Sequence, residues 1–101
     1  MAAAFVENKI RHGRVTVFVR PGCSYCRTAV ALLKEFDFLP KGLKVSDITK
    51  CEGAQEYLQQ RTGQRTVPCV FIGMHHLGGL SDLQTVRHEL PRILREIGAL
   101  R

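Results

Sequence analysis

A short, almost entirely apolar run most constrains the fold, because it leads directly into a Cys-x-x-Cys motif and a helix. Residues 15–19 are rich in β-branched side chains, which is typical of a strand buried on both faces. After a Pro-Gly break at residues 21–22, apolar side chains recur at steps of three and four residues, which predicts an amphipathic helix over residues 24–36. The motif Cys23-Ser24-Tyr25-Cys26 therefore opens a helix that follows a buried strand.

The rest of the chain alternates strands and helices. Further helices are predicted over residues 3–11, 49–61 and 81–97, and further strands over residues 43–48, 67–72 and 74–77. Thr49–Glu52 and Ser81–Gln84 have the spacing of capping boxes, and Pro91 is predicted to break or kink the last helix. Strands joined by helices imply parallel pairing, and the final hairpin adds antiparallel pairing. The sequence thus predicts one α/β domain over residues 1–101, with a central mixed sheet flanked by helices.

Composition limits the kinds of partner and the cellular compartment that we expect for this chain. The 101 residues carry 15 Lys and Arg against 9 Asp and Glu, a net charge of +6. The positive residues are scattered and are not interleaved with aromatics, which argues against nucleic acid as a partner. No apolar stretch approaches the roughly 18 residues of a membrane span, and the N-terminus lacks the pattern of a signal peptide. We therefore expect a cytoplasmic protein whose thiols stay reduced.

The cysteines carry the candidate chemistry. Four in 101 residues are too few for a disulfide scaffold, and Cys-x-x-Cys near a βαβ pattern indicates a thioredoxin-like redox site. At the helix start, unpaired N–H groups and the positive end of the helix dipole favour a thiolate on Cys23, whose pKa at such sites falls to about 3.5–7.5. Cys26, one turn later, is within disulfide reach and more covered. We predict that Cys23 attacks and Cys26 resolves, with Arg20 and Arg27 adding positive potential.

The cysteine pair also permits other interpretations. Two cysteines at this spacing can form half of a zinc site. The sequence has no second Cys-x-x-Cys and no paired histidines at zinc-finger spacing, so the other ligands would have to come from Cys51, Cys69, His75 and His76. A purely structural disulfide is disfavoured by the reducing compartment. Redox use of the pair is the favoured interpretation, and His75 and His76 are expected to be solvated at a hairpin.

The order of motifs resembles the glutaredoxins (thioltransferases), in particular the dithiol kind found in the vertebrate cytosol. The similarity covers nearly the whole chain and includes Val17–Pro21, Cys23–Cys26, Asp47–Thr49, Tyr57–Gln60, Thr62–Gly63, Arg65–Pro68, Phe71–Gly73, Gly78–Gly79, Ser81–Leu83 and Ile97–Leu100. Cys-x-x-Cys, Thr-Val-Pro and Gly-Gly-x-Ser-Asp in this order are far more specific than Cys-x-x-Cys alone. The resemblance implies a thioredoxin fold with a four-stranded mixed sheet, and glutathione as cosubstrate.

The resemblance also implies roles for individual residues. Cys23 resembles the nucleophile that takes glutathione from a mixed disulfide, and Cys26 resembles the second thiol, which only protein disulfides require. Val67-Pro68 resembles a cis-proline turn whose backbone pairs with the cysteine of glutathione. Ser81 and Asp82 resemble the helix-start group that holds the γ-glutamyl end, and Arg20 and Gln55 would meet the glycine carboxylate. The complete glutathione-binding set implied in this way is Arg20, Tyr25, Gln55, Thr66, Val67, Pro68, Gly79, Ser81 and Asp82.

These features predict a glutathione-dependent thiol–disulfide oxidoreductase that reduces protein–glutathione mixed disulfides and protein disulfides. The expected partners are glutathione, proteins that carry such disulfides, and glutathione reductase indirectly through glutathione disulfide. No nucleic acid, membrane or resident metal is expected, and the protein is predicted to be a monomer.

Departures from the family pattern leave one alternative function open. Ser24 stands where many members have proline, and serine there accompanies the ability of some members to hold a [2Fe–2S] cluster between two subunits. A cluster-binding dimer that uses Cys23 and glutathione is therefore the alternative function. Cys69, in an apolar strand, is expected to be a small core residue. Cys51, near a helix start, has no catalytic partner visible in the sequence.

Overall fold

The predicted alternation of strands and helices is present in the computed structural model, which describes residues 1–101. The sheet has the order β2-β1-β3-β4, with β1 parallel to β2 and antiparallel to β3, and β4 antiparallel to β3. Its strands are β1 (Val15–Val19), β2 (Leu43–Asp47), β3 (Cys69–Ile72) and β4 (His75–Gly78). The α-helices are α1 (Ala2–Glu7), α2 (Ser24–Leu33), α3 (Ala54–Thr62), α4 (Leu80–Thr85) and α5 (Leu90–Glu96). The four-stranded mixed sheet with flanking helices is confirmed.

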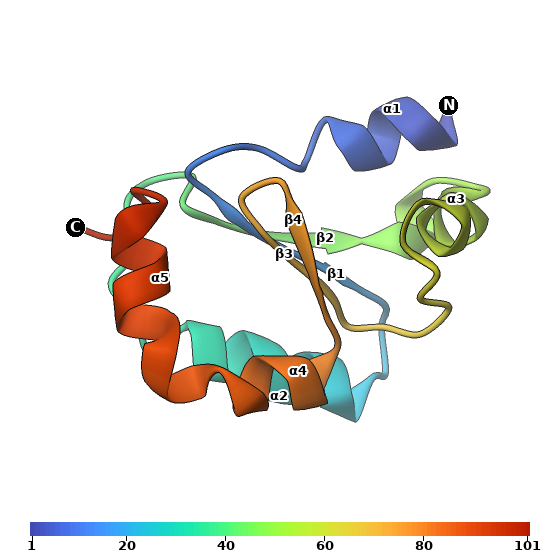
Figure 1. Ribbon diagram of the computed structural model, residues 1–101. Helices are drawn as coiled ribbons and strands as arrows, with labels where there is room; N and C mark the ends of the chain where they lie inside the picture. The colour runs from blue at the N-terminus through green and yellow to red at the C-terminus, as the bar shows by residue number, and fades with distance from the viewer.

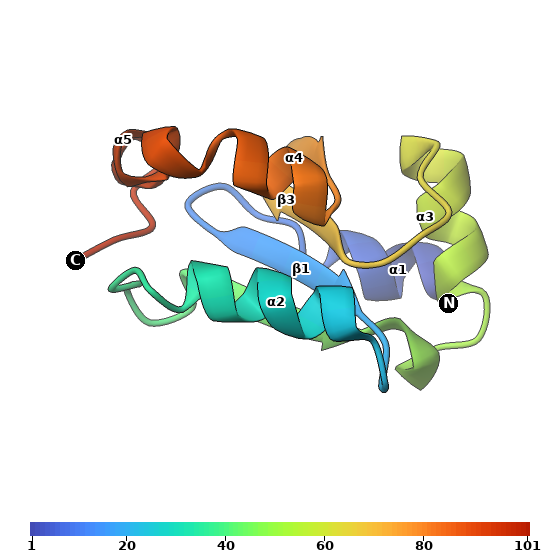
Figure 2. The ribbon, with the colours of Figure 1, turned by 90° about the horizontal axis from the view of Figure 1, so that it is seen from below.

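Helices cover both faces of the sheet, so β1 alternates between two apolar cores. Figures 1 and 2 show α2, α4 and α5 on one face and α1 and α3 on the other. Val15 and Val17 belong to the core under α2, α4 and α5, whereas Phe18 belongs to the core under α1 and α3. Phe18 meets Phe71 of β3 edge to face, with ring centroids 6.0 Å apart. The prediction that this strand is buried on both faces is confirmed.

The segment before α3 differs from the prediction. The side chain of Asp47 accepts the N–H of Thr49 at 2.8 Å, and residues Ile48–Lys50 form a 3₁₀ turn instead of the first turn of an α-helix. The α-helix begins only after Gly53, whose φ of 83° lies in the left-handed region that glycine adopts readily. The capping box predicted at Thr49–Glu52 is therefore wrong, because Asp47 supplies the competing cap two residues earlier.

The C-terminal helical region is interrupted, as the position of Pro91 predicts, but it begins at a different residue from the predicted one. The N-cap of α4 is Gly79 and not Ser81, and its N–H donates to the Asp82 carboxylate at 2.9 Å. A 3₁₀ segment, Arg87–Glu89, separates α4 from α5, and Pro91 lies in the first turn of α5, where its missing N–H costs no hydrogen bond. The first two helices are shorter than predicted, with α1 ending at Glu7 and α2 at Leu33.

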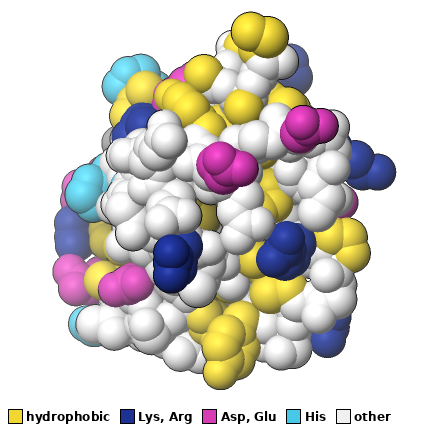
Figure 3. All heavy atoms as spheres, turned by 90° about the vertical axis from the view of Figure 1, so that its right-hand side faces the viewer, with side chains coloured by type: hydrophobic (Ala, Val, Ile, Leu, Met, Phe, Trp, Pro, Cys, Tyr) yellow, Lys and Arg dark blue, Asp and Glu magenta, His cyan; other side chains and the backbone are white.

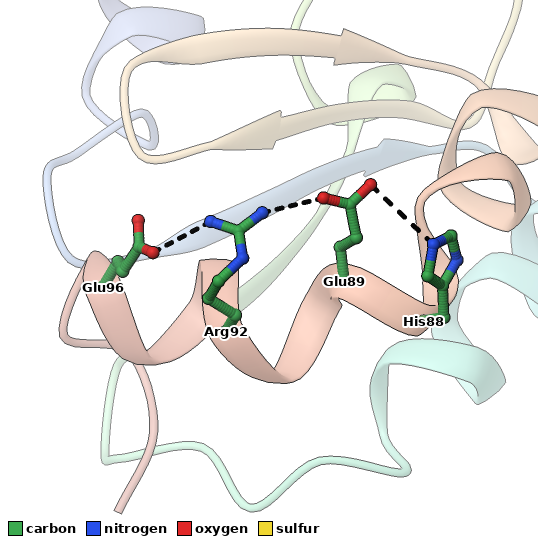
Figure 4. A network of polar contacts seen from close by, with 4 residues as sticks. All are labelled: His88, Glu89, Arg92 and Glu96. Carbon is green, nitrogen blue, oxygen red and sulfur yellow. Dashed lines mark hydrogen bonds and ion pairs between the residues drawn. The ribbon is translucent and has the colours of Figure 1, made fainter.

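Ion pairs lie on the surface of α5 and of the 3₁₀ segment before it. Helix α5 is at the opposite end of the molecule from the beginning of α2 (Figure 1). Arg92 lies between Glu89 and Glu96 and donates to them at 2.8 and 2.9 Å, and His88 lies 3.9 Å from Glu89 (Figure 4). The hydrogen bonds to Glu96 and Glu89 raise the pKa of Arg92. Such pairs, at three- and four-residue spacing, bring neighbouring side chains of an exposed helix together. None of the helices has the length and apolar character that crossing a bilayer requires.

We expect Phe71→Ala to lower the free energy of unfolding by about 3–5 kcal/mol, because the variant leaves a cavity in the core under α1 and α3. Urea unfolding followed by circular dichroism measures the change. Met74→Ala, at a side chain that is 44% exposed, is the matched control and should change stability by less than about 1 kcal/mol. Similar losses in both variants would contradict the placement of Phe71 in this core.

Candidate functional site

The Cys-x-x-Cys pair lies where β1 passes into α2. Cys23 is the N-cap residue of α2, with extended backbone angles of φ −102° and ψ 109°. Its sulfur accepts the backbone N–H of Cys26 at 3.1 Å, the Cα atoms are 5.2 Å apart, and the two sulfurs lie at disulfide-bonding distance. Cys26 is 3% exposed, whereas Cys23 is only half-buried. Because an N–H at a helix start favours negative charge, the more accessible sulfur is also the one positioned to be a thiolate.

The loop before β3 lies beside this pair and forms one wall of a groove. The Val67–Pro68 peptide bond is cis, as the resemblance implied, and the Val67 carbonyl oxygen lies 3.8 Å from the Cys23 sulfur. The groove has a volume of about 800 Å³. Seven of the nine residues predicted to bind glutathione line it: Tyr25, Thr66, Val67, Pro68, Gly79, Ser81 and Asp82.

The other two predicted residues, Arg20 and Gln55, lie together in a second hollow of about 460 Å³. The Arg20 guanidinium donates to the Gln55 side-chain oxygen at 3.1 Å, and the Gln55 amide donates to the Arg65 carbonyl at 3.0 Å. Arg65 lines this hollow, and the next residue, Thr66, lines the larger groove. The hollow and the groove are therefore adjacent at residues 65–66. An elongated ligand with an anionic end can therefore extend from Cys23 along the groove toward Arg20.

Gln64 is the main site residue that the sequence did not reveal. Its side-chain amide donates to the carbonyl oxygens of Thr66 and Pro68, both at 2.8 Å, and so braces the cis-proline loop from one side. Its oxygen lies 2.9 Å from the Nε2 atom of His76. A lone glutamine after a helix-ending glycine carries no distinctive signal, and its role appears only once β4 folds back beside the loop. Leu77, Leu80 and Gln84 also line the groove without having been predicted.

His76 is half-buried, so the expectation that it is solvated was wrong, whereas its neighbour His75 is exposed. Burial, and then the positive charge of His75, lower the pKa of His76. The ring lies in the groove wall beside Phe71, with ring centroids 5.4 Å apart.

The two remaining cysteines differ in accessibility. Cys69 is 1% exposed in β3, which confirms the expected core position, and burial raises its pKa to about 11. Cys51 is half-buried and lies in the loop before α3, lining the hollow that contains Arg20.

No group of three or more His, Cys, Asp or Glu side chains gathers in a way that could hold a metal ion. Nothing in the structure favours the zinc or cluster interpretations.

Figure 3 shows the side of the molecule that lies to the right in Figure 1, where α3 and the beginning of α2 are. Lys and Arg side chains appear there as separate spots, with Asp or Glu side chains, hydrophobic side chains and uncharged surface between them. Such a surface offers single cations to a small ligand and does not form the continuous basic stripe typical of nucleic-acid-binding proteins.

When the Cys23–Cys26 pair is oxidised, we expect iodoacetamide to modify Cys51 and to leave Cys69 unmodified. A pKa of about 11 leaves about one Cys69 thiol in a thousand as the reactive thiolate near pH 8, and burial blocks the reagent as well. Mass spectrometry of the alkylated protein locates the adducts. In concentrated urea both cysteines should react, and rapid modification of Cys69 in the folded protein would contradict its burial.

The chain is similar in sequence to known proteins of one family. The family model described as Glutaredoxin matches residues 15–77. The chain is 54% identical over 100 residues to Glutaredoxin-1 of Gallus gallus, covering 99% of both chains. It is 46% identical over 105 residues to Glutaredoxin-1 of Homo sapiens, again covering 99% of both.

Solved structures agree with the sequence comparisons. The chain is similar to a buckwheat glutaredoxin–glutathione complex, with a TM-score of 0.82 and 27% identity over 98% of this chain and 94% of that one. It is also similar to oxidised glutaredoxin 2 from Chlamydomonas reinhardtii, with a TM-score of 0.77 and 32% identity over 98% and 97% of the two chains. The thioredoxin fold implied by the sequence resemblance is thereby confirmed.

Proposed function

The chain belongs to the glutaredoxin family, and from this premise we propose that it reduces protein–glutathione mixed disulfides and protein disulfides through Cys23. It is a thiol–disulfide oxidoreductase that uses glutathione as cosubstrate. The observation that carries the proposal is the Cys26 N–H directed at the half-buried Cys23 sulfur, at 3.1 Å, beside a groove of about 800 Å³. That geometry provides an accessible thiolate next to space for a tripeptide.

The first step is a thiol–disulfide exchange at Cys23. Its thiolate attacks the glutathione sulfur of the mixed disulfide, a bond forms between these two sulfurs, and the bond to the protein sulfur breaks. The protein leaves as a thiolate, which takes up a proton from solvent. The N–H of Cys26 and the positive end of α2 stabilise the thiolate before the attack.

A second glutathione completes the cycle. Its thiolate attacks the glutathione sulfur bound to Cys23, which releases glutathione disulfide and restores the Cys23 thiolate. With a protein disulfide, the Cys26 thiol instead attacks the Cys23 sulfur of the protein-bound intermediate, and two glutathiones then reopen the Cys23–Cys26 disulfide. Glutathione reductase is an indirect partner, because it consumes the glutathione disulfide. Electron transport and deglutathionylation are two descriptions of this cycle.

The proposed binding mode spreads glutathione over both hollows. Its cysteine lies against Val67 and Pro68 beside Cys23, and its γ-glutamyl end lies against Ser81 and Asp82, where the exposed Asp82 carboxylate meets the ammonium group. Its glycine carboxylate lies toward the exposed Arg20 guanidinium and the Gln55 amide. The remaining residues of the proposed binding set form the walls of the groove: Tyr25, Thr66 and Gly79.

We extend the proposal to the state and location of the protein. All 101 residues act as one glutaredoxin domain, since α5 and the last residues pack on the core of the matched region. A monomer suffices, because one chain supplies every residue of the proposed site. A cytoplasmic location suits a mechanism that needs reduced thiols and glutathione.

We expect Cys23→Ser to abolish reduction of the mixed disulfide of cysteine and glutathione, because Cys26 and Cys69 are buried and Cys51 lines only the second hollow. Cys26→Ser should retain this reaction and lose the reduction of protein disulfides, which requires the second thiol. A coupled assay that follows the consumption of NADPH by glutathione reductase measures both. Activity of Cys23→Ser near the wild-type level would refute the proposed function.

Arg20→Met is expected to raise the KM for glutathione about two- to fivefold, because it removes one exposed cation from the proposed carboxylate position. Arg11→Met removes the same charge from an exposed side chain that lines neither hollow, and so serves as the matched control. A rise of equal size in both variants would indicate a general charge effect and would argue against contact between Arg20 and glutathione.

A further inference from the structure

A third hollow borders the redox pair and takes no part in the proposed glutathione site apart from Arg20 at its edge. It has a volume of about 500 Å³ and lies between α2 and the edge strand β2, with Cys23 at one end. Val30 and Ala31 of α2 and Val45 of β2 contribute apolar walls. We call this hollow the α2–β2 groove.

The apolar surface of the α2–β2 groove is open to solvent. Val45 is 39% exposed, which is high for a valine in a strand, and Ala31 is also exposed. Val45 lies on an edge strand, so no further strand covers it. An apolar surface next to a reactive sulfur is a natural contact for a substrate larger than glutathione.

The charge of the α2–β2 groove has one sign. Arg27 and Lys34 line it together with Arg20, and no carboxylate does. Arg27 and Lys34 form no ion pair within the chain, and Glu35, the residue after Lys34, pairs with Arg87 at 2.7 Å. Asp47 lies near the Arg20 end, where it accepts hydrogen bonds from Thr49. Two cations beside an apolar floor are thus left for carboxylates of a partner.

The chemistry of a mixed disulfide indicates which partner reaches this groove. If the glutathione half occupies the groove of about 800 Å³ that Val67 and Pro68 line, the protein half must lie on a different part of the surface around Cys23. The protein sulfur is one disulfide bond, about 2 Å, from the glutathione sulfur, so residues adjacent to the modified cysteine lie close to both cysteines of the pair. Of the three hollows described, only the α2–β2 groove is lined by Cys23 and Cys26, and it offers these residues an apolar contact.

We propose that the α2–β2 groove binds the protein half of protein–glutathione mixed disulfides and selects segments with an apolar residue and acidic side chains near the modified cysteine. The inference rests on the proposed function and adds substrate selectivity to it. Helix α2 has 10 residues and is about 15 Å long, which an extended segment spans in about four or five residues. The acidic side chains are therefore expected within that distance of the cysteine, opposite Arg27 and Lys34.

The test compares two synthetic peptides, each glutathionylated at a central cysteine flanked by leucine. One carries glutamates and the other lysines at the positions up to five residues from the cysteine. We expect the wild-type kcat/KM to be about tenfold higher for the acidic peptide at low salt. The preference should shrink toward twofold near 1 M salt, where the Debye length falls from about 10 Å to about 3 Å.

Lys34→Glu should reduce the peptide preference to less than about threefold and leave the reduction of cysteine–glutathione disulfide unchanged. Lys44→Glu is the matched control, since Lys44 is exposed on β2 but does not line the groove, and it should keep the tenfold preference. Equal turnover of both peptides by the wild type, or equal effects of the two variants, would overturn the α2–β2 groove as the docking site. Wild-type protein that fails to reduce cysteine–glutathione disulfide would overturn the proposed function and this inference together.

Discussion

The hydrogen bond from the Cys26 N–H to the Cys23 sulfur is the interaction on which the site depends. It exists because four residues separate the end of β1 from the start of α2, and Cys23, the last of them, takes the N-cap position. The start of α2 is held in place by β1, whose first four residues are buried beneath helices on both faces of the sheet. Burial of an apolar strand thus fixes the position of a polar contact, and in the proposed mechanism this contact determines which sulfur reacts.

The second half of the site is positioned by strand pairing. Phe18 of β1 pairs with Cys69 of β3, and Cys69 directly follows the cis-proline turn, so the register of two central strands sets the distance between Cys23 and Val67. Gln64 secures the turn by donating to carbonyl groups on both sides of it. A substrate therefore meets a groove that is largely formed beforehand, which limits the ordering entropy lost on binding.

The sequence predicts the core strand and the Cys-x-x-Cys helix well because their signals are local: β-branched residues, periodicity and a motif at a helix start. The prediction fails where two local signals compete, as at Asp47, whose carboxylate caps Thr49 and displaces the expected helix start to Ala54. It also misses Gln64, because the partners of that side chain come together only through the β3–β4 hairpin. The glutathione-binding set came from the family resemblance, since spacing alone does not bring Arg20 to Gln55.

The net charge of +6 is not spread evenly once ion pairs are considered, because some cations are paired with carboxylates and others are not. Arg92 is held by two carboxylates on α5, and Arg87 by Glu35, so these cations contribute little to the field at the opposite end of α2. Lys34 is unpaired but lies at the far end of α2 from Cys23. The cations beside Cys23 have no carboxylate partner: Arg20 bonds only a neutral amide, and Arg27 is unpaired. Free positive charge at this place acts twice. In the proposed mechanism it favours the Cys23 thiolate before reaction, and in the proposed binding modes it attracts the carboxylates of glutathione in one groove and those of an acidic protein segment in the other. On this proposal, the electrostatic arrangement that makes the sulfur reactive also selects which substrate reaches it.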